Sequence, residues 1–468
     1  MQAYVCPILK FEGEIKIIYD VIIIGAGPGG YSAALKAAKN GLSTLLIEKR
    51  KLGGVCLNEG CIPTKTLLYS AKIFDNAKHG DKYGVTVENI TLDHEKIVKR
   101  KDKTVKILAA GIKSALKNEG VNYVEAEAKL VKDEEGNIGV LVDGAIEMAK
   151  NIIIASGSSA ILPPIEGGLK MYSAGHVLTN REILDLTELP KSLLVVGGGV
   201  VGLELASYFC SAGAEVTVVE MLPQIGGNLD ADLAEVLNNN LQKKGINLIL
   251  NARIVEIKDG SAVCEQNGEL RELNCDKVLM SVGRCANVTG IGLEEAGIEF
   301  SAKGITTNEC CETNVKGIYA IGDVNGKLML AHTAYREADV CINRILDIAD
   351  TVDYINIPAV IYTNPETASV GETQESALEK GYECEAVTVS MRHSGRYLAE
   401  NEGGDGICKI VFDKYSKEIL GVHMIANYSS EIIYGAGMLI KNKTKVEDIE
   451  KIVFPHPSVS EIIREALI

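Results

Sequence analysis

The sequence has no long apolar run and no excess of positive charge. Among its 468 residues there is no stretch of about 18 consecutive apolar residues, so it predicts no membrane-spanning helix. The formal net charge is −15. Recognition of a nucleic acid needs clustered Lys and Arg. The acidic net charge therefore excludes a nucleic acid as a partner. The Lys-rich stretch Lys99–Lys106 has acidic neighbours, and we interpret it as the solvated face of a helix.

The N-terminus also lacks the basic start, apolar core and small-residue cleavage site of a secretory signal. Of the twelve cysteines, ten are scattered without the spacing of a metal site or a disulfide framework. They suit thiols packed as small hydrophobes, so we expect no metal site and a cytoplasmic location. The adjacent Cys310–Cys311 are interpreted as strand or loop neighbours with one buried side chain. Only Cys56 and Cys61 have a neighbourhood that indicates chemistry.

An internal repeat is the main organising feature of the chain. Residues 19–48 read as an apolar strand, a glycine turn, a helix and a second apolar strand that ends on an acid, and residues 191–220 repeat this plan. The first glycine and the terminal acid are 23 residues apart in both copies. Two βαβ units of the dinucleotide-binding kind are therefore predicted.

The first unit contains the glycine pattern Gly25-Ala-Gly27-Pro28-Gly-Gly30 directly after its apolar strand. The first glycine makes the tight turn, the second lets a pyrophosphate approach the backbone, and the third allows close helix–strand packing. Glu48 ends the second strand, where a carboxylate can bind an adenosine ribose. The alternative for Glu48 is a solvated strand end, and we favour ribose binding because the glycines precede it at the right distance.

The second unit repeats this arrangement with Gly197, Gly199 and Gly202. Its terminal acid, Glu220, would repel the 2′-phosphate of NADP, and Met221–Pro223 offers no Arg to bind that phosphate. The sequence therefore favours NAD over NADP at the second site.

Between the first unit and a long charged helix, predicted from about Asp93 to Asn118, lies the segment LGGVCLNEGCIPTK. Pro63 is tolerated in a first helical turn, so Cys61 is expected near a helix N-terminus, where a thiolate is stabilised. Lys65 lies four residues on, on the same helical face. A cation near the thiol suits a redox pair formed by Cys56 and Cys61; the alternative is two unrelated cysteines and a solvated lysine.

GGVCLNEGCIPTK resembles the redox-disulfide motif of the class I pyridine nucleotide–disulfide oxidoreductases, and of the dihydrolipoamide dehydrogenases among them. Further similar motifs follow in order to the end of the chain: Ile154-Ala-Ser-Gly157-Ser158, Val282-Gly283-Arg284, Thr313 to Asp323, Ala331-His332-Thr-Ala334, Pro358 to Glu366, and His456-Pro-Ser-Val-Ser-Glu461. The resemblance implies an α/β fold with two Rossmann-like domains, for FAD and NAD, and a C-terminal α+β dimerisation domain.

The order of strand, helix and proline patterns along the chain predicts domain boundaries. They are 1–148 for the first part of the FAD domain, with 1–18 as an unplaced N-terminal arm, 149–281 for the NAD domain, 282–350 for the returning FAD part, and 351–468 for the dimerisation domain. The arm matches nothing in the family and is expected to be either an edge strand or a flexible segment.

The family's residue roles are carried over by position. Cys56 resembles the thiol that exchanges with the substrate, and Cys61 the thiol against the flavin. Lys65 resembles the lysine that approaches the flavin and pairs with an acid, here Glu204. The remaining cofactor contacts implied by the resemblance are Gly157, Asp323, Ala331 and His332 for FAD, and Gly199, Glu220 and Gly283 for NAD.

His456 resembles the general base that takes the proton of dihydrolipoamide, held by Glu461. An imidazole titrates in the useful range, and a carboxylate orients it. However, Ser458-x-x-Glu461 before an apolar run is also a capping box. Because one carboxylate can hardly serve both fully, we favour the orienting role. Many relatives have a histidine at the position of Phe454, and its loss changes the pocket rather than the reaction.

The expected activity is oxidation of protein-bound dihydrolipoamide with reduction of NAD, in a homodimer whose His456 reaches the cysteines of the partner subunit. The expected protein partner is a lipoyl domain of an acyltransferase or of the H-protein, within a 2-oxoacid dehydrogenase or glycine cleavage complex. The alternative is another NAD(P)H-dependent disulfide reductase of the family. Glu220 and Leu57–Glu59 argue against glutathione reductase, and the ending Glu465–Ile468 argues against mercuric reductase. A purely non-catalytic docking role is disfavoured because both cysteines and both fingerprints are retained.

Overall fold

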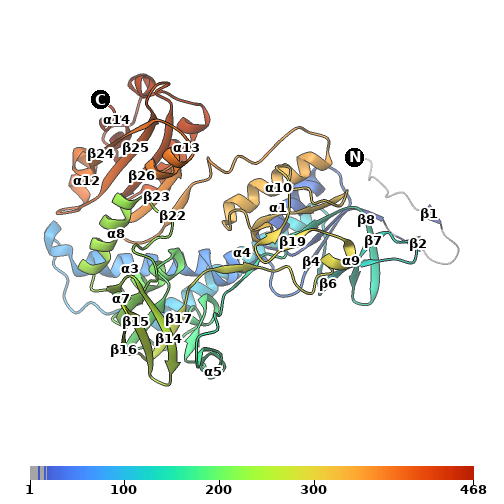
Figure 1. Ribbon diagram of the computed structural model, residues 1–468, viewed down its shortest axis with the longest axis horizontal. Helices are drawn as coiled ribbons and strands as arrows, with labels where there is room; N and C mark the ends of the chain where they lie inside the picture. The colour runs from blue at the N-terminus through green and yellow to red at the C-terminus, as the bar shows by residue number, and fades with distance from the viewer. Residues whose placement is uncertain (1–8, 11–14, 17) are drawn as a thin grey trace. The chain divides into compact units, whose positions relative to one another are not determined.

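The computed structural model describes residues 9–10, 15–16 and 18–468 (Figure 1). The predicted N-terminal arm, 1–18, lies mostly outside the described residues. The described part of it includes the short antiparallel strands β1 (Leu9–Lys10) and β2 (Ile15–Lys16). None of the helices in the described part is both long and apolar enough to cross a membrane.

The chain divides into two compact units, each assembled from three segments. The first unit holds 1–63, 101–160 and 284–354, and the second holds 64–100, 161–283 and 355–468. The four-part division expected from the sequence stays a prediction, because this division joins the second nucleotide-binding segment and the C-terminal region in one unit.

The first unit is built on a parallel sheet in the order β5-β4-β3-β8, with β21 beyond β8. Its strands are β3 (Ile18–Ile24), β4 (Thr44–Glu48), β5 (Asn122–Glu125), β8 (Ala145–Ile154) and β21 (Ile318–Ala320). Antiparallel β7 (Ile138–Val142) and β6 (Ala128–Lys132) extend from β8. Apolar β-branched runs such as Val21–Ile24 are buried, as expected for strands covered on both faces.

Two helices of this unit pack against each other, α1 (Pro28–Lys39) and α10 (Ala331–Ile345), and lie side by side in Figure 1. Pro28 opens α1, because proline has a suitable φ angle and no N–H to leave unpaired there. Small buried residues, Ala33, Ala34 and Ala37, let α1 approach its neighbours closely.

The second unit contains the same plan. Its parallel sheet has the order β10-β17-β11-β12-β13, and an antiparallel β14-β15-β16 meander accompanies it. The parallel strands are β10 (Val177–Leu178), β11 (Ser192–Val196), β12 (Glu215–Val219), β13 (Asn247–Ile249) and β17 (Lys277–Met280). The meander strands are β14 (Ala252–Lys258), β15 (Ser261–Gln266) and β16 (Glu269–Asn274). Helix α7 (Val200–Ala212) connects β11 to β12 and is buried along most of its length.

The C-terminal region of the second unit is an antiparallel sheet in the order β22-β23-β26-β25-β24. Its strands are β22 (Ala359–Ile361), β23 (Glu366–Gly371), β24 (Cys384–Ser390), β25 (Ile407–Asp413) and β26 (Ile419–Ala426). Helix α13 (Ser429–Lys441) packs on β23 and β26. Two nucleotide-binding folds and an α+β region confirm the predicted fold class.

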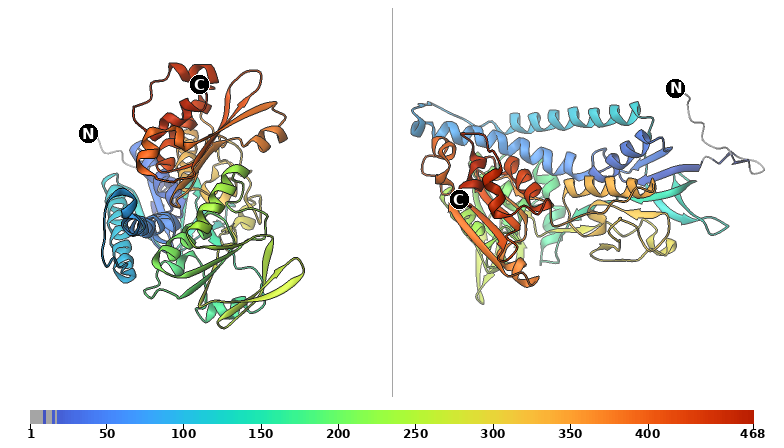
Figure 2. Two further views of the ribbon diagram at one scale, coloured as in Figure 1. Left: turned by 90° about the vertical axis from the view of Figure 1, so that its left-hand side faces the viewer. Right: turned by 90° about the horizontal axis from the view of Figure 1, so that it is seen from above.

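Two local predictions are also tested by the structure. The long charged helix is confirmed as α4 (His94–Asn118), the cyan helix in the right-hand view of Figure 2. The prediction that its lysines all face solvent is wrong for Lys101, whose side chain is only 3% exposed and pairs with Asp102 at 2.7 Å. The interpretation of Cys310 and Cys311 is confirmed, because Cys311 is buried and Cys310 is half-buried in a turn.

The first glycine turn leads to a stability prediction. A Cβ on Gly30 would lie 1.8 Å from the carbonyl oxygen of Gly25, whereas a Cβ on the helical Gly111 of α4 meets nothing within 4 Å. We expect Gly30→Ala to lower the free energy of unfolding by about 3 kcal/mol. Gly111→Ala should raise it by about 1 kcal/mol, because alanine has the higher helix propensity. Urea unfolding followed by circular dichroism measures both, and equal effects of the two substitutions would contradict the packing argument.

Candidate active site

The first glycine turn is fastened by the acid at the end of β4. Gly25 has φ 102° and donates its N–H to the carbonyl of Ile47 at 2.7 Å. The Glu48 carboxylate accepts the N–H of Ala26 through Oε2 and the N–H of Arg50 through Oε1, both at 2.8 Å. Glu48 is only 8% exposed, so it is not the solvated strand end considered as the alternative.

The second glycine turn repeats these contacts atom for atom. Gly197 has φ 104° and donates its N–H to the carbonyl of Val219 at 2.9 Å. Glu220 accepts the N–H of Gly198 through Oε2 at 2.6 Å and that of Leu222 through Oε1 at 2.8 Å. The internal repeat of the sequence is therefore a repeat of the same hydrogen-bonded turn.

Both turns have the geometry that a dinucleotide pyrophosphate requires. The N-cap residues are Gly27 in α1 and Gly199 in α7, and glycine has no side chain that could cap the first N–H groups of these helices. A Cβ on Gly199 would meet nothing within 4 Å, and on Gly27 it would meet only the Cα of Gly54 at 3.9 Å. Open space beside helix N-terminal N–H groups fits a phosphate group. The residues present therefore fit FAD at the first turn and NAD at the second.

The cysteine segment packs directly on the first turn. The N–H of Gly53 donates to the carbonyl of Ala26 at 2.9 Å, and a Cβ on Gly54 would lie 2.6 Å from the Cα of Gly27. Only glycine permits this approach, and φ is also positive at both residues of the pair. Gly53 and Gly54 thus bring the redox segment next to the nucleotide-binding turn.

The two cysteines lie on consecutive helices. Cys56 is in the short helix α2 (Gly54–Glu59), which the sequence did not predict, and Cys61 opens α3 (Cys61–Lys78) as expected. Both cysteine residues are partly exposed. Between them, Glu59 is buried and accepts from Arg50 Nη2 at 2.5 Å, which links this segment to the backbone that Glu48 holds. A helix N-terminus favours the thiolate form of the cysteine that opens it.

Lys65 and Glu204 form the predicted ion pair. Lys65 Nζ lies 2.8 Å from Glu204 Oε2 and 3.0 Å from Oε1, and the Glu204 side chain is 3% exposed. Tyr362 completes the group: its N–H donates to Glu204 Oε1 at 3.0 Å, and its ring lies 4.3 Å from Lys65 Nζ. Sequence reasoning gave no role to Tyr362, because a cation–π contact between residues about 300 positions apart leaves no local signal.

Asp323 lies in a polar group of the first unit. It occupies the 3₁₀ turn η2 (Gly322–Asn325) and accepts the hydroxyl of Ser158 through Oδ2. Arg284 donates to Ser158 Oγ at 2.7 Å and to the Ser158 carbonyl at 2.8 Å. Gly157 precedes this serine with φ 72°. Sequence reasoning matched Ser158 and Arg284 only as parts of motifs and did not connect them to Asp323, because neither stands near Asp323 in the chain.

The structure also gives the positions of four further predicted residues. Ala331 and His332 open α10, and Gly283, with φ 118°, directly precedes Arg284. Gly202 lies in α7, where a Cβ would approach the carbonyl oxygen of Gly197 to 2.3 Å. This matches the helix–strand packing expected of the third glycine in the fingerprint.

The predicted contact between His456 and Glu461 is confirmed, and the expectation that Glu461 could not also serve as the capping residue is wrong. Glu461 Oε1 lies 2.8 Å from His456 Nδ1, while Oε2 accepts the N–H of Ser458 at 2.8 Å. A carboxylate has two oxygens, and here each serves one partner. The Ser458 N–H and the His456 imidazole lower the pKa of Glu461. The His456 side chain is 81% exposed in the single chain.

Comparison with known proteins gives the class. Residues 19–338 match the Pyridine nucleotide-disulphide oxidoreductase family, and residues 357–467 match its dimerisation domain. The chain therefore belongs to the pyridine nucleotide-disulphide oxidoreductases and carries their dimerisation domain, which supports a homodimer.

Individual relatives agree with this class. A dihydrolipoyl dehydrogenase of Rhizobium etli is 36% identical, over 96% of this chain and 97% of the relative. A mitochondrial dihydrolipoyl dehydrogenase of Pisum sativum is 38% identical, over 96% of this chain and 90% of the relative. The solved structure of the HOCl-induced flavoprotein disulfide reductase RclA from Escherichia coli superimposes with a TM-score of 0.84 at 25% identity, over 96% of this chain and 99% of that one.

The buried ion pair leads to a stability prediction. Glu204→Gln would remove the counter-charge of Lys65 at a position where the Glu204 side chain is 3% exposed, and we expect a loss of about 1–3 kcal/mol in the free energy of unfolding. The matched control is Glu265→Gln, which neutralises an acid paired with the exposed Arg253 and should change stability by less than about 0.5 kcal/mol. Thermal and urea unfolding compare the two, and similar losses for both would show that the Lys65–Glu204 pair adds nothing to stability.

Proposed function

We propose that this chain is a dihydrolipoyl dehydrogenase, which oxidises protein-bound dihydrolipoamide and reduces NAD⁺ to NADH. The observation that carries the proposal is the packing of the Cys56–Cys61 segment on the first of two equivalent nucleotide-binding turns. A dithiol–disulfide couple next to one dinucleotide site, in a chain with a second such site, suits electron transfer from a dithiol to a pyridine nucleotide. The names of relatives that are 36–38% identical over almost the whole chain support the same activity.

The thiol chemistry follows from these residues. A thiolate of dihydrolipoamide attacks the Cys56 sulfur of the Cys56–Cys61 disulfide, forming a mixed disulfide and releasing Cys61 as a thiolate. The second substrate thiol then attacks its own mixed-disulfide sulfur, so that lipoamide leaves with its ring disulfide and Cys56 keeps the electron pair. The two substrate thiols lose two protons; one is used to form the hydride of NADH, so the overall reaction releases one. The residues of the first glycine turn would hold FAD, which would supply the two-electron carrier between the reduced cysteines and NAD⁺.

His456 is assigned as the base that accepts the substrate proton. Glu461 orients it, because the contact at Nδ1 leaves Nε2 as the nitrogen available to a substrate. In the family's homodimer this histidine serves the cysteines of the partner subunit, and the high exposure of the His456 side chain in the single chain is consistent with that role. Lys65, paired with Glu204, is assigned to the flavin side of the site.

Each cofactor has an assigned set of residues. FAD would be held by Gly25, Gly27, Pro28, Gly30, Glu48, Gly157, Asp323, Ala331 and His332. NAD would be held by Gly197, Gly199, Gly202, Glu220 and Gly283. The Glu220 carboxylate lies where a nucleotide ribose is bound in such folds, and its charge disfavours a 2′-phosphate, so NAD is preferred to NADP.

The proposed partner is the lipoyl domain of an acyltransferase or of the H-protein, in a 2-oxoacid dehydrogenase or glycine cleavage complex. The proposed location is the cytoplasm, supported by cysteines such as Cys264, Cys275 and Cys408 that pack as buried thiols. Burial raises the pKa of Cys275 to about 11 and that of Cys408 to about 12, so these thiols stay protonated and unreactive.

The activity test is NADH formation from dihydrolipoamide and NAD⁺ by the purified full-length protein. We expect Cys56→Ser to abolish turnover and His456→Gln to lower kcat by about 10²- to 10⁴-fold, the usual contribution of a general base. The matched controls are Cys285→Ser, at an exposed thiol, and His393→Gln, at an exposed histidine of the C-terminal region, and both should keep wild-type turnover.

The same assay would also reveal that the protein acts on a different substrate. Turnover only with NADPH and glutathione disulfide would retain the disulfide chemistry and overturn dihydrolipoamide as the substrate. That outcome would favour the alternative, another disulfide reductase, which the structural similarity to RclA keeps as the second candidate.

Nucleotide choice gives a separate prediction. Glu220→Gln removes the charge but keeps a hydrogen-bonding side chain, so we expect the ratio of kcat/KM for NAD⁺ to that for NADP⁺ to fall about tenfold, because the variant loses one charge-assisted hydrogen bond. Glu215→Gln, at the exposed first residue of the same strand, is the control. If the ratio of kcat/KM for NAD⁺ to that for NADP⁺ were unchanged in Glu220→Gln, the carboxylate would not determine the choice of nucleotide.

A further inference from the structure

The turn that carries Asp323 is held in place by a residue outside it. Gly322–Asn325 forms a single 3₁₀ turn, in which Gly322 adopts φ 72°. Such a short turn has too few internal hydrogen bonds to fix its own orientation. The direction of the Asp323 carboxylate therefore depends on what holds the two ends of the turn.

Glu337 of α10 holds both ends. Its Oε2 accepts the N–H of Gly322 at 2.5 Å, and its Oε1 accepts from Asn325 Nδ2 at 2.8 Å. The hydroxyl of Tyr354 also donates to Oε1, at 2.7 Å. One carboxylate thus connects the first and last residues of the turn and fixes the span between them.

Glu337 is fully buried, so its hydrogen bonds must offset the free-energy cost of removing a carboxylate from water. The residue is 0% exposed, and burial raises the pKa of its carboxyl group. A buried acid is costly unless its oxygens are hydrogen-bonded, and an apolar side chain would fill the same helix position without that cost. The three donors to Glu337 are neutral groups, two of which belong to the turn itself.

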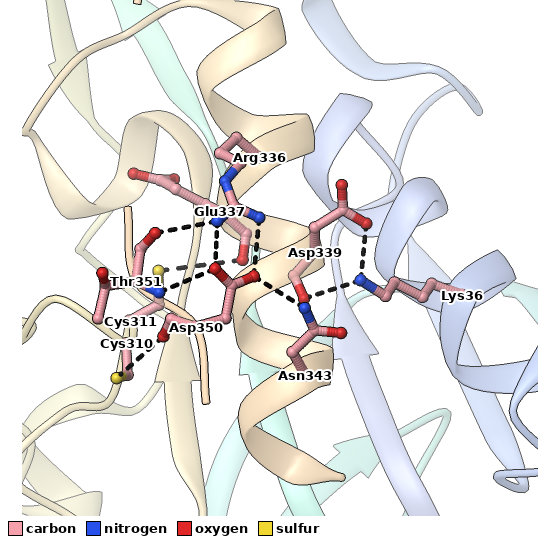
Figure 3. Close-up of polar contacts among 9 residues, drawn as sticks. All are labelled: Lys36, Cys310, Cys311, Arg336, Glu337, Asp339, Asn343, Asp350 and Thr351. Atoms are coloured by element: carbon pink, nitrogen blue, oxygen red, sulfur yellow. Dashed lines mark hydrogen bonds and ion pairs between the residues drawn. The ribbon is translucent and has the colours of Figure 1, made fainter. Parts of the chain in front are cut away.

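The rest of α10 is anchored separately from the turn. Arg336 donates to both oxygens of Asp350, and Lys36 of α1 pairs with Asp339 at 2.9 Å (Figure 3). Asn343 adds a bond to Asp350 at 2.8 Å. Arg336, Asp339 and Asn343 therefore contact residues outside the Gly322–Asn325 turn, whereas the Glu337 carboxylate contacts both of its ends.

We propose that Glu337 is a positioning residue for FAD, which fixes the Gly322–Asn325 turn so that Asp323 is already oriented when the cofactor binds. The inference rests on the proposed FAD site and deepens it, because it names the buried group that sets cofactor affinity by acting through Asp323. Preorganisation of this kind lowers the free-energy cost of binding.

Glu337→Gln tests the inference. Glutamine has one oxygen and one NH₂ group, so in either orientation its NH₂ faces an N–H donor of the turn and at least one bond is lost. We expect the FAD dissociation constant of the full-length protein, measured by flavin fluorescence on the apoprotein, to rise at least about tenfold, which is about 1.4 kcal/mol. Asp339→Asn removes the same charge from the same helix. It should change the FAD dissociation constant by less than about twofold, because the Asp339 side chain is 49% exposed and pairs with Lys36 rather than with the turn.

A second variant separates positioning from folding. Tyr354→Phe keeps the carboxylate and removes one donor, so we expect FAD affinity to fall by about threefold to tenfold while the unfolding temperature of the apoprotein stays close to wild type. Equal FAD affinity in wild type, Glu337→Gln and Tyr354→Phe would overturn the inference alone. So would losses of FAD affinity no larger than those in Asp339→Asn. A wild-type protein that does not bind FAD would instead overturn the proposed function.

Discussion

The structure depends on a carboxylate that closes a glycine turn. In both nucleotide-binding folds the acid at the end of the second strand accepts two backbone N–H groups, one from the glycine turn and one from the residue two positions beyond the acid itself. This ties the first strand–helix turn to the end of the second strand. This contact also sets the direction of the helix that follows. The N-terminus of that helix has no side-chain cap and can bind a phosphate. Without the carboxylate, a turn of three glycines would have little to hold one conformation.

The cysteine segment depends on that turn in its own way. Gly53 and Gly54 let the backbone touch the turn at Ala26 and Gly27, at distances that no other residue would allow. Backbone contacts, rather than a side-chain pocket, therefore position the redox segment. Arg50 and Glu59 then connect the segment back to the loop that Glu48 fastens. A single chain of contacts joins the nucleotide turn, its acid and the cysteine helices.

Buried acids have the same physical role elsewhere in the molecule. Glu204 brings together Lys65 and the backbone of Tyr362, and Glu337 brings together Gly322, Asn325 and Tyr354. Burying a carboxylate is costly, and the cost is recovered only when its oxygens meet well-placed donors. Because these bonds are directional, a buried acid specifies a local geometry that apolar packing would leave loose.

Much of this could be predicted from the sequence where the signal is local. The spacing of Gly25 from Glu48 and of Gly197 from Glu220 predicts both nucleotide folds, and the charged periodicity after Asp93 predicts α4. Two expectations failed: that Glu461 could not fill both of its roles, and that the whole Lys99–Lys106 run faces solvent. Glu461 serves both His456 and Ser458, and Lys101 is buried within an otherwise solvated helical run. The short helix that contains Cys56 could not be predicted, because its sequence has neither a capping residue nor a helical hydrophobic periodicity.

By itself the sequence determined the order of elements, the two glycine turns and the reactive residue types, since these depend on backbone conformation and on spacing along a few turns of chain. Only the tertiary structure decided which residues support them: Tyr362 beside Lys65, Ser158 and Arg284 around Asp323, and Glu337 beneath the turn. These partners come from distant segments that meet only after the sheets have formed. No periodicity records such a meeting, because the hydrogen bonds that select them act through space and not along the chain.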